Sequence, residues 1–239
     1  MNLIPSSAIG ASVLLMAGAA SAQVTQVDLG GVVNTAYSIG GPVGLTAGNT
    51  GTALSSLTFD LRDPSTTSNV WVGYSTGDSI TLHPDLYGVG SAYSLFNTLF
   101  GQAGLPTVSI EFKGSAGADQ TFTLTGNTDI RDYNNWVWTN SINGTTTQEW
   151  WTNNLNPSPT DQSHRWDAQV YALAPAFATQ TLTDIVITAG QVGGNYSQPM
   201  LAALDLQVAA VPEPASAALT LAGLLGLAAF ATRRRSTDR

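Results

Sequence analysis

The sequence predicts an all-β fold, an antiparallel two-sheet sandwich of the jelly-roll type with one short helix, between two hydrophobic segments near the chain ends. Three observations indicate this class. Short stretches in which apolar and polar residues alternate recur along the interior of the chain, as they do in half-buried strands. Turn residues separate these stretches about every 8–12 residues, and β-branched and hydroxylated residues fill them. A single helical pattern is too little for alternating strand–helix units.

Residues 1–22 have the character of a signal peptide. Their apolar centre ends in small residues, and Ala20 and Ala22 suit signal peptidase, so we expect cleavage before Gln23. No Lys or Arg precedes the apolar centre, which departs from the usual pattern. The interior of the chain, 23–210, contains 188 residues and is expected to form one domain with a substantial core.

Alternation predicts the strands in the first half of this interior. In 54–61, for example, Leu57, Phe59 and Leu61 fall on one face of an extended chain. Glycine-rich or proline-containing turns follow most of these stretches. The strands expected here are 24–29, 32–39, 54–61, 70–74 and 79–82.

Residues 91–103 follow a different pattern. Tyr93, Phe96, Leu99 and Phe100 recur at spacings of three and four residues, which is the period of one face of a helix. We therefore expect a short amphipathic helix that ends at the glycines after it. Strands are expected again at 108–112, 121–125, 169–173, 182–188 and 201–208.

The part of the chain that follows is rich in tryptophan. The pair Asn143-Gly144 is a strong hairpin signal, so strands are expected at 137–142 and 145–151. By the two-residue period of a strand, Trp136 and Trp138 are expected to share one face.

Trp150 and Trp151 are adjacent, so we expect them to point to opposite faces, one buried and one exposed. An exposed ring beside amides and carboxylates is suited to a sugar, because the C–H face of the sugar packs on the ring while polar groups bond its hydroxyls. The candidate glycan-contact residues are Asp132, Asn134, Asn135, Trp150 and Trp151. The alternative is that the tryptophans fill the core and cover an edge of the sandwich, as large aromatic residues usually do.

The interior carries few charges, and most of them are acidic. Fourteen Asp and Glu against four Lys and Arg give it a net charge of about −10. Such a surface repels phosphate backbones, which excludes nucleic acid as a partner. The chain has no Cys, which excludes disulfides and cysteine-ligated metal sites.

No catalytic residues and no cofactor are predicted. Glycoside hydrolysis uses two carboxylates that flank the scissile bond. The interior contains only two glutamates, Glu111 and Glu149, and neither lies in an acidic motif, although aspartate pairs stay open for this role. His83 and His164 lack an accompanying nucleophile motif.

A metal site is not predicted either. Asp129, Asp132 and Asn134 offer oxygen atoms of the kind that calcium prefers. The residue spacing of a calcium-binding loop is missing, however, and the alternative role of such residues is in turns.

The end of the chain combines three parts in a fixed order: Val211-Pro212-Glu213-Pro214, the uncharged stretch 215–231, and Arg233-Arg234-Arg235. The uncharged stretch has 17 residues, near the short limit of roughly 17–25 for a transmembrane helix. Arginines mark a cytoplasmic flank, so the interior is expected on the far side of the inner membrane. The prolines hold the segment before the helix extended, as binding in a protease cleft requires.

This order resembles the PEP-CTERM sorting signal of Gram-negative bacteria. The resemblance covers about the last 29 residues, 211–239, and implies export and handling at the inner membrane by an exosortase, a transpeptidase-like membrane protease. The domain is then released or attached at the cell surface. The alternative is an ordinary C-terminal anchor helix behind a proline-rich stalk.

Three functions stay open for the exported domain. The first, which the resemblance implies, is a non-enzymatic surface or matrix protein associated with exopolysaccharide and biofilm. The second is a carbohydrate-binding module with an exposed tryptophan surface, and the third is a secreted hydrolase. We prefer the first, with signal peptidase, the exosortase and exopolysaccharide as expected partners.

Overall fold

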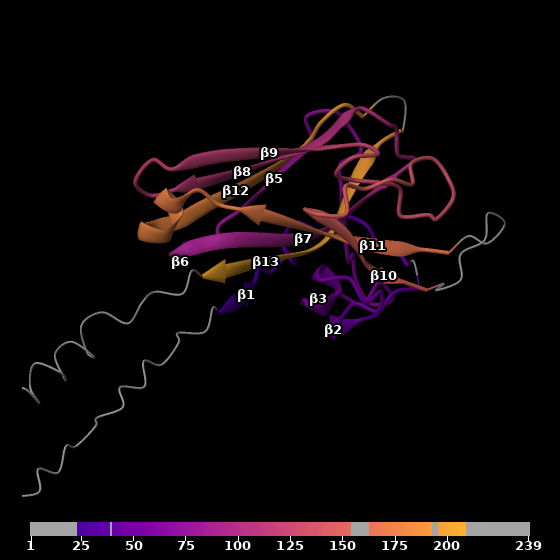
Figure 1. The fold of residues 1–239 in the computed structure, drawn as a ribbon, viewed down its shortest axis with the longest axis horizontal. Coiled ribbons are helices and arrows are strands. Elements are labelled where there is room, and N and C mark those ends of the chain that lie inside the picture. Colours follow the sequence, from indigo (N-terminus) through magenta and orange to yellow (C-terminus); the bar gives the residue numbers. More distant parts are fainter. Residues whose placement is uncertain (1–22, 39, 154–162, 193–195, 209–239) are drawn as a thin grey trace, which may run out of the picture. The chain divides into compact units, whose positions relative to one another are not determined.

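The structure, a computed structural model, describes residues 23–38, 40–153, 163–192 and 196–208 (Figure 1). All of them belong to one compact unit that spans residues 22–209. The expected signal peptide 1–22 and the expected sorting segment 211–239, with its helix 215–231, lie outside the described residues.

Within the described part of the chain, no helix has both the length and the apolar character needed to cross a membrane.

The described residues form thirteen strands and two short 3₁₀ helices, so the expectation of a β-rich fold with antiparallel sheets is confirmed. Turns shape the connections; Gly117, for instance, has a positive φ in the tight turn between two of the strands. The strands are β1 (Val24–Gln26), β2 (Gly44–Ala47), β3 (Thr58–Leu61), β4 (Trp71–Val72), β5 (Ser79–Leu82), β6 (Leu86–Tyr87), β7 (Val89–Leu99), β8 (Pro106–Gly114), β9 (Asp119–Thr125), β10 (Thr147–Thr152), β11 (Arg165–Ala172), β12 (Thr181–Ala189) and β13 (Gln198–Val208), and the 3₁₀ helices are η1 (Leu54–Ser56) and η2 (Pro175–Thr179).

The strands make two large antiparallel sheets and one small one. The first sheet has the order β1-β13-β7-β11-β10, with β4 also paired to β13. The second has the order β5-β12-β8-β9, with β6 also paired to β12, and β2 pairs with β3 alone. Figure 1 shows the second sheet lying over the first, with β2 and β3 on the other side.

The main core fills the space between the two large sheets. Phe96 of β7 and Leu204 of β13 come from the first sheet, and Phe112 of β8 and Ile187 of β12 come from the second; all are fully or almost fully buried. Phe112 and Tyr171 of β11 contact each other with ring centroids 5.9 Å apart. Two sheets that share one core in this way form a sandwich.

A second core covers the opposite face of the first sheet. Leu95 and Leu99 of β7 and Met200 of β13 pack there with Phe59 of β3 and Trp150 of β10. The small β2–β3 sheet and η1 therefore act as a third layer, which the sequence did not predict. As a result, the central strands β7 and β13 are buried on both faces for most of their length.

The helix expected at 91–103 is wrong, because this segment forms most of the 11-residue strand β7, Val89–Leu99. A strand that is buried on both faces shows no alternation of apolar and polar residues, so its period does not distinguish it from a buried helix. Phe96 enters the main core while Leu95 and Leu99 enter the second core, and their helix-like spacing is a consequence of this double burial.

The hairpin expected around Asn143-Gly144 is also wrong. Residues 137–142 form no strand, and β10 pairs with β11 instead. The Asn143 side chain explains the turn, because its Oδ1 accepts hydrogen bonds from the backbone N–H groups of Thr145, Thr146 and Thr147 at 2.8–3.0 Å. These bonds satisfy the backbone locally, without a paired strand.

Two further strands are shorter than expected. In the expected strand 32–39, the described residues contribute only an isolated bridge between Thr35 and Val70. In the expected strand 54–61, the first residues form η1 and only Thr58–Leu61 are extended as β3.

The central pair β7–β13 has two distinct ends. At one end, which we call the terminal end, Val24 of β1 lies opposite Gln207, and the N–H of Val208 donates to the carbonyl of Gln23 at 2.9 Å. At the other, the far end, Leu99 lies opposite Gln198. β13 has 11 residues, which at the usual rise of a strand puts these two ends about 33 Å apart.

Candidate functional site

The loop between β9 and β10, residues 126–146, lies against the far end of β7. Thr98, near the end of β7, donates its N–H to Arg131 O and accepts from Tyr133 N–H, both at 3.0 Å. The loop thus adds a short parallel bridge, Thr98 to Asp132, to the first sheet. This connection fixes the beginning of the loop on a rigid strand.

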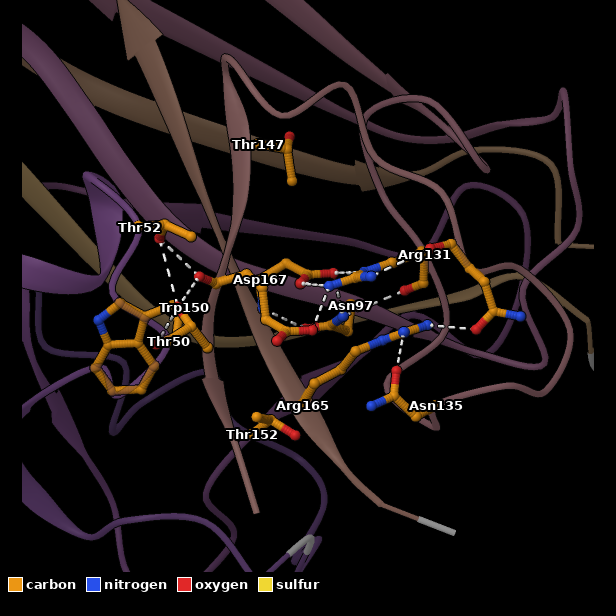
Figure 2. Close-up of polar contacts among 12 residues, drawn as sticks. Thr50, Thr52, Asn97, Arg131, Asn135, Thr147, Trp150, Thr152, Arg165 and Asp167 are labelled. Carbon is orange, nitrogen blue, oxygen red and sulfur yellow. Dashed lines mark hydrogen bonds and ion pairs between the residues drawn. The ribbon is translucent and has the colours of Figure 1, made fainter. Parts of the chain in front are cut away.

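A buried ion pair holds the same loop from beneath (Figure 2). Arg131 donates from Nε and Nη2 to the two carboxylate oxygens of Asp167 at 2.8 and 2.7 Å, and Nη2 also reaches Glu149 Oε2 at 2.8 Å. Asn97 of β7 donates from Nδ2 to Asp167 at 2.9 Å and accepts from the Asp167 backbone. The Asp167 side chain is fully buried, so this two-pronged bond is shielded from water.

Arg165, also on β11, supports the middle of the loop. Its guanidinium donates to Asp132 O at 2.8 Å, to Thr139 O at 3.0 Å and to Asn140 Oδ1 at 3.1 Å, and it also bonds Asn135 Oδ1. Figure 2 shows Arg165 and Asn135 next to the Arg131–Asp167 pair. Arg165 and Asp167, which lie two residues apart on β11, therefore hold the loop 126–146 in place.

The pKa values of the two arginines are shifted in opposite directions. Burial lowers the pKa of Arg165 to about 10, helped by the neighbouring charge of Arg131. Burial opposes the charged form of Arg131 as well, but Asp167 and Glu149 outweigh it and raise the Arg131 pKa. The guanidinium groups therefore stay charged at neutral pH.

Asp132 links the loop to the turn after β7. Its Oδ2 accepts from Gly101 N–H at 2.9 Å and its Oδ1 accepts from Asn134 N–H at 2.8 Å, while its own N–H donates to Thr139 Oγ1 at 2.9 Å. Burial raises the pKa of Asp132 to about 6, although these backbone bonds favour the carboxylate. The residue is only 1% exposed and acts as a positioning group rather than as a ligand contact.

Ser197 fixes the same turn from the side of β13. Its N–H donates to Phe100 O at 2.9 Å, and its Oγ accepts from Gln102 N–H at 2.8 Å. Phe100 and Tyr196 therefore flank the far end of the β7–β13 pair, one just after β7 and the other two residues before β13.

Three exposed aromatic rings meet there, and we call them the aromatic cluster: Phe100, Trp138 and Tyr196. The ring centroids of Phe100 and Trp138 are 5.8 Å apart with an angle of 88° between the rings, and those of Trp138 and Tyr196 are 5.8 Å apart at 55°. The side chains are 44%, 54% and 40% exposed, respectively. Trp136, two residues before Trp138, is 49% exposed.

The backbone around the cluster is unusual. Phe100, Trp136, Trp138 and Ser197 all have φ between 56° and 65°, in the left-handed region. For residues other than glycine this conformation costs roughly 1–2 kcal/mol each. It persists because the bonds to Asp132, Ser197 and Asn140 leave the chain no alternative path, as strained residues in general require.

The segments that build the far end contain no charged side chain. Residues 96–106, 133–146 and 196–202 include no Asp, Glu, Lys or Arg, although the interior as a whole has a net charge of about −10. Their polar groups are amides and hydroxyls. Asn140 and Ser141, both exposed, lie in the loop beside Trp138.

The predicted glycan-contact residues are mostly buried. Trp150 has no exposed surface, and its Nε1 donates to Leu57 O at 2.8 Å, so it offers no ring face to a ligand. Trp151 is half-buried and packs against the same second core as Trp150, where we expected an exposed ring on the opposite face. Asn135 is buried and bonds Ser163 at 2.9 Å, whereas Asn134 is half-buried.

The expected placement of Trp136 and Trp138 on one strand face is wrong, since they lie in a loop. The rings that are exposed together, Phe100, Trp138 and Tyr196, were not selected from the sequence because 196 comes about 60 residues after 138. The one signal that pointed to them is the absence of charge in the three segments that carry them.

Within the described residues, no group of three or more His, Asp or Glu side chains has an arrangement that fits a metal ion. His83 Nδ1 lies 2.7 Å from Asp184 Oδ1, and both side chains are at the surface. His164 stacks on Tyr133 with ring centroids 5.4 Å apart, beside the loop.

Comparison with known families identifies the end of the chain. Residues 210–235 match the family model of the PEP-CTERM protein-sorting motif, which confirms the resemblance seen in the order of Pro-Glu-Pro, apolar stretch and arginines. The motif implies that the protein is processed by an exosortase, a membrane protease, and sorted to the cell surface. No curated protein matches the chain.

Proposed function

We propose that the folded domain is a non-enzymatic protein of the cell surface or extracellular matrix, sorted there by the exosortase and associated with exopolysaccharide. The observation that carries this proposal is the continuity of fold and sorting motif. β13 ends at Val208, and the motif begins at residue 210. Almost no linker separates the domain from the segment that the protease handles.

The position of β13 within its sheet supports this interpretation. β13 is hydrogen-bonded to β1 on one side and to β7 on the other, so it is a central strand of the sheet. A strand held on both sides resists being pulled out of the fold. Attachment through the segment after Val208 would therefore leave the domain intact.

The expected signal-peptidase cut and the last residue of β13 lie at the same end of the domain. Gln23, where we expect signal peptidase to cut, bonds Val208 at the terminal end. In a domain attached through the chain after Val208, the far end of the β7–β13 pair would be the part of this sheet most distant from the attachment. This arrangement suits a protein that displays one surface to its surroundings.

A non-catalytic role is supported by the way the domain uses its polar side chains. Asp167 and Arg131 are bonded to each other, and Arg165 is bonded to carbonyl and amide oxygens of the loop 126–146. Asp132 accepts backbone hydrogen bonds with both of its oxygens. These groups stabilise a shape rather than face a substrate.

Fractionation of cells tests the sorting proposal. The native chain and a variant with alanine at Pro212, Glu213 and Pro214 are compared, with Thr237→Ala, outside the matched motif, as the control. We expect native and control chains to lose the C-terminal segment and to be recovered with the exopolysaccharide, and the triple variant to keep that segment and stay in the membrane fraction. Equal length and location of native chain and triple variant would contradict the proposal.

A second measurement addresses the non-enzymatic part. Purified protein is incubated with glycoside, ester and peptide substrates and with the polysaccharide of the producing cells. We expect no turnover above the level of a heat-denatured sample. Hydrolysis that disappears when a surface carboxylate such as Asp184 is replaced by Asn would establish an enzyme instead.

A further inference from the structure

The geometry points to a binding site for a neutral polysaccharide at the far end of the domain, centred on Trp138 of the aromatic cluster. This inference rests on the proposed function, because it names the contact through which a matrix protein would hold the matrix. It differs from the surface expected around Trp150, which is buried.

Trp138 offers the ring on which a sugar can pack. It is 54% exposed although it is a large apolar side chain, and Phe100 and Tyr196 border it on two sides. The C–H face of a sugar ring is apolar, and packing on an indole removes both surfaces from water. Flanking rings set at angles to Trp138 would limit how a sugar lies across it.

The rings are held in place before any ligand arrives. Phe100 is fixed by bonds of its backbone and its neighbours to Ser197 and Asp132. Trp138 precedes Thr139, whose Oγ1 and carbonyl accept from Asp132 N–H at 2.9 and 3.2 Å. Little side-chain and loop ordering is then left to oppose binding, which is the usual benefit of a preorganised site.

Hydrogen-bonding groups of the right kind lie next to the rings. Asn140 Oδ1 accepts from Trp136 N–H at 2.8 Å, which leaves its exposed amide nitrogen facing no described acceptor. Ser141 is exposed beside it, and Gln102 is half-buried in the turn after Phe100. Amides and hydroxyls match the alternating donors and acceptors of sugar hydroxyls.

Charge selects a neutral glycan over other occupants. The segments that carry the rings contain no charged side chain, and the charged groups beneath them, Arg131, Asp132 and Arg165, are buried and bonded within the domain. The far end therefore offers no partner for uronate, sulfate or phosphate groups, and the acidic domain repels all three. An anionic lipid surface is disfavoured for the same reason. A second copy of this chain would carry the same charge of about −10 to the contact, which leaves a neutral polysaccharide as the occupant.

Affinity electrophoresis tests the site. The full chain is purified in a detergent that carries no sugar and is run through native gels that contain dextran, laminarin, galactomannan or the polysaccharide of the producing cells, with alginate as the acidic comparison. We expect retardation by at least one neutral polysaccharide and none by alginate. No retardation by any neutral polysaccharide, or retardation by alginate alone, would overturn the inference.

Matched variants locate the binding. Trp138→Ala is compared with Tyr87→Ala, because Tyr87 is equally exposed at 57% but lies on β6, away from the cluster. We expect Trp138→Ala to weaken binding about tenfold or more, as loss of a central aromatic contact generally does, and Tyr87→Ala to leave it unchanged. Near-UV circular dichroism checks that both variants fold. Equal losses in the two variants would contradict the assignment.

Two controls separate this inference from its rivals. Sedimentation that shows a native dimer and a monomeric Trp138→Ala variant would assign the cluster to self-association and overturn the polysaccharide site. Native protein that reaches the matrix together with Trp138→Ala, without binding in gels, would reject the site but leave the proposed sorting intact. Protein that binds in gels but never leaves the cell would reject the sorting and leave the site.

Discussion

The domain buries two carboxylates in its first sheet and treats them in opposite ways. Asp167 of β11, beneath the loop 126–146, is held by Arg131 and Asn97. Asp205 of β13, opposite β1, is only 3% exposed, and its carboxylate accepts no hydrogen bond from a described donor. Burial, together with the nearby Asp60, raises the pKa of Asp205 to about 7. The buried carboxylate that supports the loop 126–146 is therefore paired with an arginine, whereas the buried carboxyl of Asp205, which supports no loop, has no such partner.

This contrast shows which part of the fold is fixed in one exact arrangement. Buried ion pairs add little net stability compared with apolar residues, but they specify one arrangement because any other leaves a charge unpaired. Asp205 lines a half-open pocket of about 270 Å³, together with Asp28, Asp60 and Arg62. That region tolerates a carboxyl that exchanges its proton near neutral pH.

Removing the partner of Asp167 is expected to have the largest effect. Arg131→Ala leaves a fully buried carboxylate without its ion pair, so we expect the free energy of unfolding to fall by about 3–5 kcal/mol. Urea unfolding followed by tryptophan fluorescence measures it. The control is Lys113→Ala, which breaks the half-exposed pair with Glu111 at 3.0 Å and should cost far less, because water screens that pair. Similar losses in both variants would remove the distinction between the two kinds of charge.

Asp132→Asn is expected to act on the aromatic cluster itself. The amide retains only one acceptor oxygen, so either Gly101 N–H or Asn134 N–H loses its partner, at a cost of about 1–3 kcal/mol. Hydrogen exchange of these two amides should accelerate, whereas the amides of β8 and β12 should change only with global stability. Unchanged exchange at Gly101 and Asn134 would show that Asp132 does not position the turn.

Asp205→Asn tests the unpaired carboxyl. Because the folded-state pKa is raised, the folded protein binds a proton that the unfolded chain has lost between about pH 4 and 7. Stability should therefore fall as pH rises through this range, by at most about 1.4 kcal/mol per pH unit for this group. We expect the variant to flatten the slope and to be more stable than the native protein at pH 8, by about 1–2 kcal/mol.

The variant keeps a smaller slope from Asp132, whose pKa is raised to about 6. Unfolding curves at pH 5, 6, 7 and 8 measure both proteins. A slope that Asp205→Asn leaves unchanged would mean that its carboxyl titrates in the folded protein as it does in the unfolded chain.

The smallest expected change in stability comes from Trp138→Gly. Deleting a large side chain usually destabilises a protein, but here the ring is half exposed and the backbone has φ of 56°. Glycine relieves a strain of roughly 1–2 kcal/mol, which offsets the lost contacts with Phe100 and Tyr196. We expect the free energy of unfolding to change by less than about 1 kcal/mol while polysaccharide binding is lost. A loss above about 2 kcal/mol would mean that the ring is needed for folding.

Much of the fold could be predicted from the sequence, namely those strands that have one face exposed to solvent. β5, β8, β9 and β12 were predicted because apolar residues alternate along them. β7 was missed because both of its faces are buried, so no alternation marks it. The third layer formed by β2 and β3 causes that double burial, and nothing local in β7 reveals it.

The candidate site was less accessible. Its supports join residues that are far apart in the chain, such as Arg131 with Asp167 and Gly101 with Asp132, and spacing does not disclose such pairs. Tryptophan content drew attention to the stretch that contains Trp138, but the selected rings were Trp150 and Trp151. Trp150 and Trp138 are alike in the sequence, and only tertiary packing buries the first and exposes the second.

Labelling of a single cysteine tests the central claim most directly, namely that the domain is exported with its far end open to the surroundings. The chain contains no natural cysteine, so Ser141→Cys, in the exposed loop beside Trp138, gives one thiol. Intact cells are treated with a maleimide that does not cross membranes. We predict that Cys at 141 reacts fully before lysis, whereas Thr152→Cys, on the buried face of β10, does not. Reaction at position 141 only after lysis would contradict export and, with it, the proposed function.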